Sequence, residues 1–81
     1  MNIEQFKELI NSSREIEFDY NGSRFSITYY NDNRPNHISF CEFNKEPVDV
    51  KSADELLRVN IDNISVEEII SSLPDSNFDI F

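Results

Sequence analysis

Residues 14–30 read REIEFDYNGSRFSITYY, and this stretch predicts a β-hairpin with a defined register. Asn21-Gly22 at its centre is the strongest short-range hairpin signal, because both central positions of a type I′ turn need a positive φ. A two-residue loop places Phe18 opposite Phe25 and Ile16 opposite Ile27, so one face of the ribbon is apolar. A slip of one residue would turn every side chain to the other face, so the turn and the apolar pattern support the same register.

A third strand is expected at 37–43, pairing with the second strand of the hairpin. If Tyr29 lies opposite Ile38, the apolar face extends onto this strand. Glu42 interrupts the alternation, and a bulge or the end of the sheet near it would let Phe43 turn inward. The side chains expected on the opposite, uncovered face of the sheet are Glu15, Glu17, Asp19, Ser26, Thr28, Tyr30, Ser39 and Cys41.

Three segments combine an N-terminal capping signal with apolar residues at helical spacing, and we expect helices at 3–11, 53–57 and 66–73. In the second and third, a Glu three residues after the cap completes a capping box, with its carboxylate reaching back to the cap residue's amide. Pro74 ends the last helix. The expected N-cap residues are Asn2, Ser52 and Ser65.

The rest of the chain supplies connections and one further strand. Residues 31–36 are nearly all turn formers and predict a loop. Residues 47–50 predict a short edge strand, where Pro47 costs no ladder hydrogen bond. The segment 76–81 forms a strand, a coil pinned onto the body, or a free tail. Residues 1–81 are therefore expected to form one α+β domain, a three- to four-stranded antiparallel meander with an N-terminal helix and two C-terminal helices on one face.

Several of these stretches resemble short uncharacterised proteins that are common in Gram-positive bacteria and their prophages. The stretches that carry the resemblance are 15–22, 25–27, 52–57 and 61–63. The chain departs from the family pattern at Asn63, where a glycine is expected, although asparagine also adopts a left-handed turn. The resemblance implies a setting in a mobile element and no mechanism.

Charge decides which partners are favoured. Sixteen acidic and seven basic residues give a net charge of −9, which argues against direct binding to nucleic acid or to an anionic membrane. A protein with a basic surface is the favoured partner. The sequence opens without a secretory pattern and contains no apolar run of membrane-spanning length, so a cytoplasmic location is expected.

The chain contains few residues of the types that usually act as catalytic groups or metal ligands. His37 and Cys41 are the only histidine and the only cysteine, and four residues along a strand separate them by about 13 Å. They form neither a nucleophile–base pair nor a zinc tetrahedron. Gly22 is the only glycine, so a phosphate-cradling loop is absent from the sequence. The chain is expected to hold no metal and no cofactor and not to be an enzyme; a deep polar pocket around two facing carboxylates would favour the opposite.

The function expected from these observations is that of a small acidic, non-enzymatic protein-binding module, an accessory protein of a phage or mobile element. The alternative is an anti-defence inhibitor or DNA mimic that blocks a nucleic-acid-binding host protein. The acids and hydroxyls of the uncovered sheet face need no partner to explain them, because a plain solvated face carries such residues, so this interpretation is preferred for the face itself to a partner surface anchored by Tyr30. The residues predicted to contact a partner are Glu15, Glu17, Asp19, Tyr30, Glu67, Glu68, Asp75 and Asp79.

Overall fold

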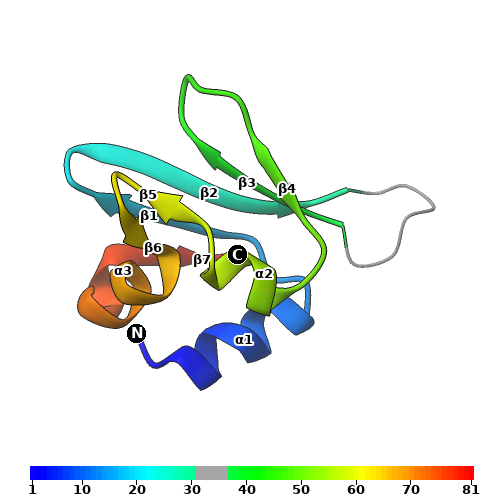
Figure 1. Cartoon of the computed structure of the whole chain (residues 1–81). Helices are drawn as coiled ribbons and strands as arrows, with labels where there is room; N and C mark the ends of the chain where they lie inside the picture. Colours follow the sequence, from blue (N-terminus) through cyan, green and yellow to red (C-terminus); the bar gives the residue numbers. More distant parts are fainter. Residues whose placement is uncertain (31–36) are drawn as a thin grey trace.

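A five-stranded antiparallel sheet with strand order β4-β3-β2-β1-β7 forms the body of the molecule, and the helices lie against one face of it (Figure 1). The computed structural model describes residues 1–30 and 37–81, so the loop expected at 31–36 lies outside the described residues. The strands of the sheet are β1 (Ile16–Tyr20), β2 (Ser23–Tyr29), β3 (Ile38–Glu42), β4 (Val48–Val50) and β7 (Phe78–Ile80). The remaining elements are α1 (Ile3–Asn11), α2 (Ala53–Leu57), α3 (Val66–Ser72), the 3₁₀ turn η1 (Asp75–Asn77) and the small hairpin of β5 (Asn60–Ile61) and β6 (Ile64–Ser65).

The β1–β2 hairpin confirms the predicted register. Phe18 pairs with Phe25 and Ile16 with Ile27, and the turn residues Asn21 and Gly22 have φ values of 52° and 81°. The two phenylalanine rings stack with their centroids 5.3 Å apart. All four of these strand side chains are buried beneath the helices, which explains why only this register is compatible with the apolar pattern.

The third strand follows the expected pairing but ends differently. Tyr29 pairs with Ile38, as predicted, and Glu42 pairs directly with Phe25, so β3 ends at Glu42 without a bulge. The prediction that Phe43 turns inward is wrong, because its side chain is 48% exposed. The Phe43 N–H donates to the Arg24 carbonyl at 2.9 Å. Because the side chains keep alternating between the two faces past Glu42, Phe43 lies on the face away from the helices.

The strand count is higher than the predicted three to four, because the C-terminal segment adds a fifth strand. Of the three alternatives for 76–81, the strand is the one observed: β7 pairs with β1, with Ile80 opposite Ile16 and Phe78 opposite Phe18. Phe78 is 8% exposed and its ring centroid lies 5.4 Å from that of Phe18. Burial of this ring against the free edge of β1 explains why the segment is held as a strand.

A second hairpin, formed by β5 and β6, was not predicted. Its turn residues Asp62 and Asn63 have φ values of 52° and 69°. Both positions of the turn are thus left-handed, as in a type I′ turn, and Asn63 supplies this conformation without being a glycine. The hairpin places β6 directly before α3.

The predicted N-caps form at all three helices. The side chains of Asn2, Ser52 and Ser65 each accept a hydrogen bond from the backbone N–H three residues later, at 3.1 to 3.2 Å. The Glu55 carboxylate, expected to reach the Ser52 amide, instead accepts from the Lys51 N–H at 3.3 Å. The helix start is therefore capped as predicted, and the returning bond is made one residue earlier in the chain.

The chain start stabilises the end of the last helix. The Met1 ammonium group donates to the carbonyls of Ile70 at 2.8 Å and Leu73 at 2.6 Å, and its side chain is 1% exposed. Carbonyl groups at a helix C-terminus lack partners within the helix and carry partial negative charge. The ammonium group therefore caps α3, which has no basic residue in its last turn.

The core lies between the helical layer and one face of the sheet, here called the inner face. Every helix and both strands of the central hairpin contribute to it. The largest side chains that are less than 2% exposed are Phe6, Ile16, Phe18, Ile27, Leu56, Val66, Ile69 and Ile70.

Candidate functional site

The sheet face turned away from the helices is the main candidate surface. We call it the outer face and define it by the register: Glu17 lies between Ser26 and Asp79, and Ser39 lies between Thr28 and Asp49. Carboxylates, hydroxyls and one thiol alternate with the buried residues of the inner face, because successive side chains of a strand point to opposite sides. The outer-face residues are Glu17, Asp19, Arg24, Ser26, Thr28, Ser39, Cys41, Asp49 and Asp79.

Arg24 gathers three of the carboxylates that were predicted to contact a partner. Its guanidinium lies 3.1 Å from Glu17 and 3.2 Å from Asp19, and it also contacts Asp79. The hydrogen bond to Asp79, followed by those to Glu17 and Asp19, raises the pKa of Arg24 above its usual range. The Arg24 contact with Asp79 joins residues 55 positions apart. Only the pair of Asp19 and Arg24 follows from the hairpin register, so sequence reasoning missed the full cluster.

Tyr30 lies at the other end of β2 and belongs to a second polar group. Its hydroxyl donates to Asp49 at 3.1 Å, and its ring centroid lies 4.2 Å from the His37 imidazole. The His37 Nε2 atom is 3.5 Å from the same carboxylate of Asp49. Tyr30 is 40% exposed at this end of the sheet.

Two exposed aromatic residues near the outer face were not among the predicted contact residues. Phe43 is 48% exposed beside Arg24, and Phe81 is 62% exposed. The Phe81 N–H donates to the carbonyl of the exposed residue Glu15 at 2.9 Å, which continues the β7 pairing by one residue. A strand that continues regularly through Glu42 places Phe43 on the outer face, and this signal could have located it from the sequence. The position of Phe81, in contrast, depends on the tertiary pairing of β7 with β1.

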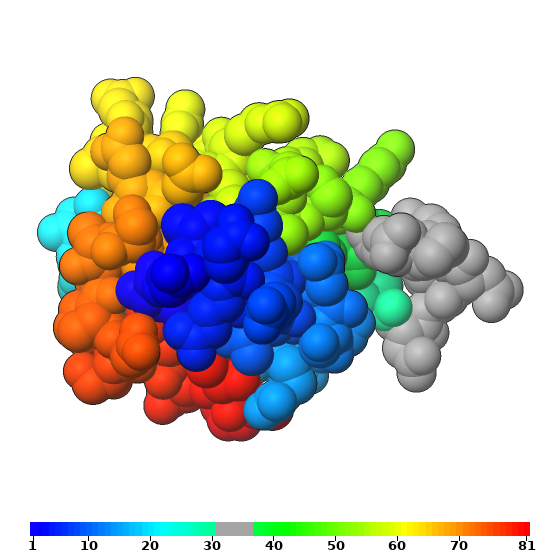
Figure 2. Space-filling view, turned by 90° about the horizontal axis from the view of Figure 1, so that it is seen from below, coloured from blue at the N-terminus to red at the C-terminus, as the bar shows by residue number. Residues whose placement is uncertain are grey.

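The other predicted contact residues lie on the helical side. Glu67 and Glu68 occupy the first turn of α3, and the carboxylate of Asp75 is 3.8 Å from the Met1 ammonium. Figure 2 views this side, where α1 (blue) lies beside both α3 (orange) and α2 (yellow-green). The predicted set therefore does not form one site: Glu15, Glu17, Asp19, Tyr30 and Asp79 belong to the sheet, and the remaining three to the helical layer.

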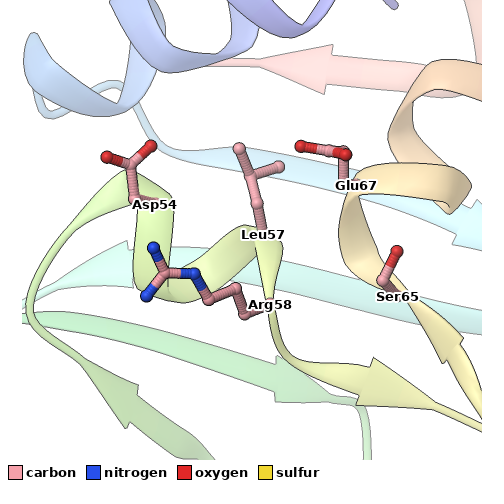
Figure 3. Close-up of a pocket in the computed structure, with 5 residues that line it drawn as sticks. All are labelled: Asp54, Leu57, Arg58, Ser65 and Glu67. Atoms are coloured by element: carbon pink, nitrogen blue, oxygen red, sulfur yellow. The ribbon is translucent and has the colours of Figure 1, made fainter.

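A shallow pocket opens between α2 and α3 on the helical side. Figure 3 shows the carboxylates of Asp54 and Glu67 on either side of Leu57, with Arg58 and Ser65 completing the lining. Both carboxylates belong to exposed residues. A general acid that works near neutral pH usually depends on burial, so these exposed groups lack that feature.

A lysine amine contacts the pocket-lining residue Asp54 and is protonated. Lys7 Nζ lies 3.0 Å from Asp54, and the hydrogen bond and charge of Asp54, with smaller contributions from Glu4 and Glu67, raise the pKa of Lys7. A nucleophilic lysine needs a lowered pKa. The arrangement is therefore that of an exposed ion pair linking α1 to α2.

Comparison with protein-family models, with curated proteins and with solved structures finds no match to this chain. Within residues 1–30 and 37–81, no three or more His, Cys, Asp or Glu side chains are grouped so that they could hold a metal ion. In the same ranges, every helix is too short or too polar to cross a membrane.

Proposed function

We propose that this chain is a small acidic, non-enzymatic module that binds a protein with a basic surface through the outer face of its sheet. The observation that carries this proposal is the asymmetry of the sheet. In the described part of the chain, helices cover the inner face (Figure 1), while the outer face presents carboxylates and hydroxyls. The resemblance to prophage proteins supports the further proposal that it acts as an accessory protein of a phage or mobile element in the cytoplasm.

Charge supports the choice of a basic partner. The outer face carries the acids Glu17, Asp19, Asp49 and Asp79 against the single cation of Arg24. Arg24 already donates to three of these acids, yet their side chains keep 33%, 66% and 58% of their surface exposed. Lysine or arginine side chains of a partner thus find accessible carboxylate oxygens, and the overall charge of −9 steers such a partner toward the protein.

Aromatic side chains supply anchors at two ends of this face. Tyr30 and Phe43 are 40% and 48% exposed, and the β2–β3 pairing separates them by about six strand positions, or roughly 20 Å. Aromatic residues that become buried contribute most of the binding free energy at many interfaces. Each of the two residues can anchor a partner that spans the sheet.

The alternative proposal is an anti-defence inhibitor that presents carboxylates in place of DNA phosphates. The net charge and the alternating acids of β1 support it, because phosphate contacts dominate nucleic-acid binding. The Arg24 cluster weakens it for the outer face, since a guanidinium placed among the carboxylates reduces the negative potential that a DNA-binding surface would recognise.

Two triple variants with equal charge change test the proposal. Glu17→Gln, Asp49→Asn and Asp79→Asn alter the outer face, whereas Glu67→Gln, Glu68→Gln and Asp75→Asn alter the helical side. Each protein is immobilised and exposed to a lysate of a Gram-positive bacterium, and the retained proteins are identified. The unmodified protein and the helical-side variant are expected to retain the same basic protein, and the outer-face variant to lose it.

Equal retention by all three proteins, or loss in the helical-side variant alone, contradicts binding through the outer face. Purified partner is then titrated with the protein in the presence of duplex DNA. Displacement of the partner from DNA, weakening steeply as salt rises, favours the mimic. Binding that leaves the DNA complex intact favours a plain protein contact.

A further inference from the structure

A groove of about 240 Å³ lies between the β3–β4 hairpin and the β5–β6 hairpin, outside the outer face. Its walls are apolar where the two hairpins face each other: Val48 comes from β4, and Val59 and Ile61 come from the chain around β5. Val48 is 44% exposed, which is unusual for a valine on the inner-face side of a strand. The groove therefore offers apolar surface that no helix of the described chain covers completely.

Glu42 stands at the edge of this groove in a position that the strand pattern assigns to an apolar residue. It lies opposite the buried Phe25, and its own side chain is 22% exposed. A carboxylate that is largely removed from water needs a cation or hydrogen-bond donors to offset the lost hydration. The cation present is Lys45, with its Nζ atom 3.3 Å from Glu42, and this lysine is itself 67% exposed. A pair of this kind is weak when its lysine is exposed and mobile in water, so another cation can displace Lys45.

The rim of the groove is acidic as a whole. Glu46 and Asp62 line it together with Glu42, and Lys45 is the cation among the lining residues. Three acids and one base leave this rim with a net charge of −2 (3 − 1). The groove thus combines apolar walls with a negative edge, which matches a side chain that has an apolar stem and a cationic head.

We propose that this groove receives an arginine side chain from the protein partner, an inference that rests on the proposed function and adds a second contact to it. The guanidinium group has five N–H donors in one plane and is more weakly hydrated than an ammonium group. It can donate hydrogen bonds to Glu42 together with Glu46 or Asp62, while its methylene stem covers the exposed surface of Val48. The β3–β4 hairpin projects beyond the rest of the sheet (Figure 1), so a partner lying on the outer face can reach around its tip.

The test uses short peptides as probes, so that it does not depend on knowing the partner. Acetyl-Gly-Arg-Gly-amide is titrated into isotopically labelled protein to a concentration on the order of 10 mM, in the millimolar range expected for a single side chain. Backbone amide signals are expected to shift at Lys45, Val48 and Ile61. The matched peptide with citrulline, which keeps the shape of arginine without its charge, is expected to leave these signals unchanged.

Two variants of the groove give opposite expectations. Glu42→Gln is expected to weaken arginine-peptide binding about threefold, and Lys45→Gln to strengthen it by a similar factor, because the first removes the receiving charge and the second removes its competitor. Circular dichroism and melting temperature confirm that both variants remain folded. The outer-face triple variant is expected to bind the peptide as the unmodified protein does.

The inference is overturned if neither variant changes peptide binding, if citrulline binds as well as arginine, or if the groove signals do not shift. Signals that shift only at outer-face residues such as Ser26 and Cys41 also overturn it, while leaving the proposed function intact. Conversely, if the outer-face variant retains the lysate protein as well as the unmodified protein does, the proposed function is contradicted and the peptide result is unaffected. The two proposals therefore fail separately.

Discussion

The two faces of the sheet are made from the same strands, residue by residue in alternation, but different forces act on them. On the inner face, the rings of Phe18, Phe25, Phe40 and Phe78 pack with centroid distances of 5.3 to 6.4 Å, and each is at most 8% exposed. On the outer face, ion pairs around Arg24 remain open to water. Burying one phenylalanine contributes about 1.5–3 kcal/mol, whereas exposed ion pairs contribute about 0–1 kcal/mol.

This difference indicates which positions tolerate substitution without loss of the fold. The inner face carries most of the free energy of folding, so its residues are constrained by packing. The outer face contributes little to folding, so its residues are available for recognition.

The largest effect is expected from Phe18→Ala, which removes the ring at the centre of the aromatic group. Phe→Ala changes in cores cost about 3–5 kcal/mol, which is close to the whole stability of a domain of this size. We expect this variant to be largely unfolded by circular dichroism. The milder Phe18→Leu should remain folded with a lower denaturant midpoint.

The matched outer-face control is Thr28→Ala, one strand away and exposed. Its free energy of unfolding should change by less than about 0.5 kcal/mol. A control variant as unstable as Phe18→Leu would show that the outer face also holds the fold together.

A smaller effect is expected from Arg24→Gln, which leaves Glu17, Asp19 and Asp79 facing one another without their cation. The melting temperature should fall at low ionic strength and recover as salt is added, because salt screens repulsion between exposed charges. Lys51→Gln makes the same change in net charge away from the cluster. If both variants show the same salt dependence, the cluster itself has no special role.

The smallest effect concerns Tyr29, whose hydroxyl donates to the Arg14 carbonyl at 2.8 Å. Partial burial, and to a lesser extent the charge of Glu15, raise the pKa of Tyr29 from 10 to about 12. Ionisation is thus harder in the folded than in the unfolded chain. The stability linked to this proton is full below pH 10 and is lost as the pH rises through 12.

Melting temperatures measured between pH 9 and 12 should therefore fall less steeply in Tyr29→Phe than in the unmodified protein. Ultraviolet titration should show that this variant lacks the absorbance change expected near pH 12 from Tyr29. If the absorbance change that this variant lacks instead falls near pH 10, Tyr29 is as accessible to water in the folded chain as in the unfolded chain.

Local patterns were sufficient to predict a large part of this molecule. The Asn21-Gly22 turn, the pairing of Phe18 with Phe25 and the three N-caps all follow from residues within a few positions of one another. Turn geometry, capping and side-chain alternation act at that range, so the sequence by itself determined the central hairpin, the helix starts and the polar character of the outer face.

Only the tertiary structure decided how distant segments meet. It paired β7 with the edge of β1, brought Asp79 to Arg24, divided the predicted contact residues between two sides of the molecule, and opened the groove beside Glu42. These contacts join residues far apart in the chain, and no local propensity encodes them. They form because the apolar surface of the whole domain must be buried at once, and the position of each charged side chain then follows from that packing.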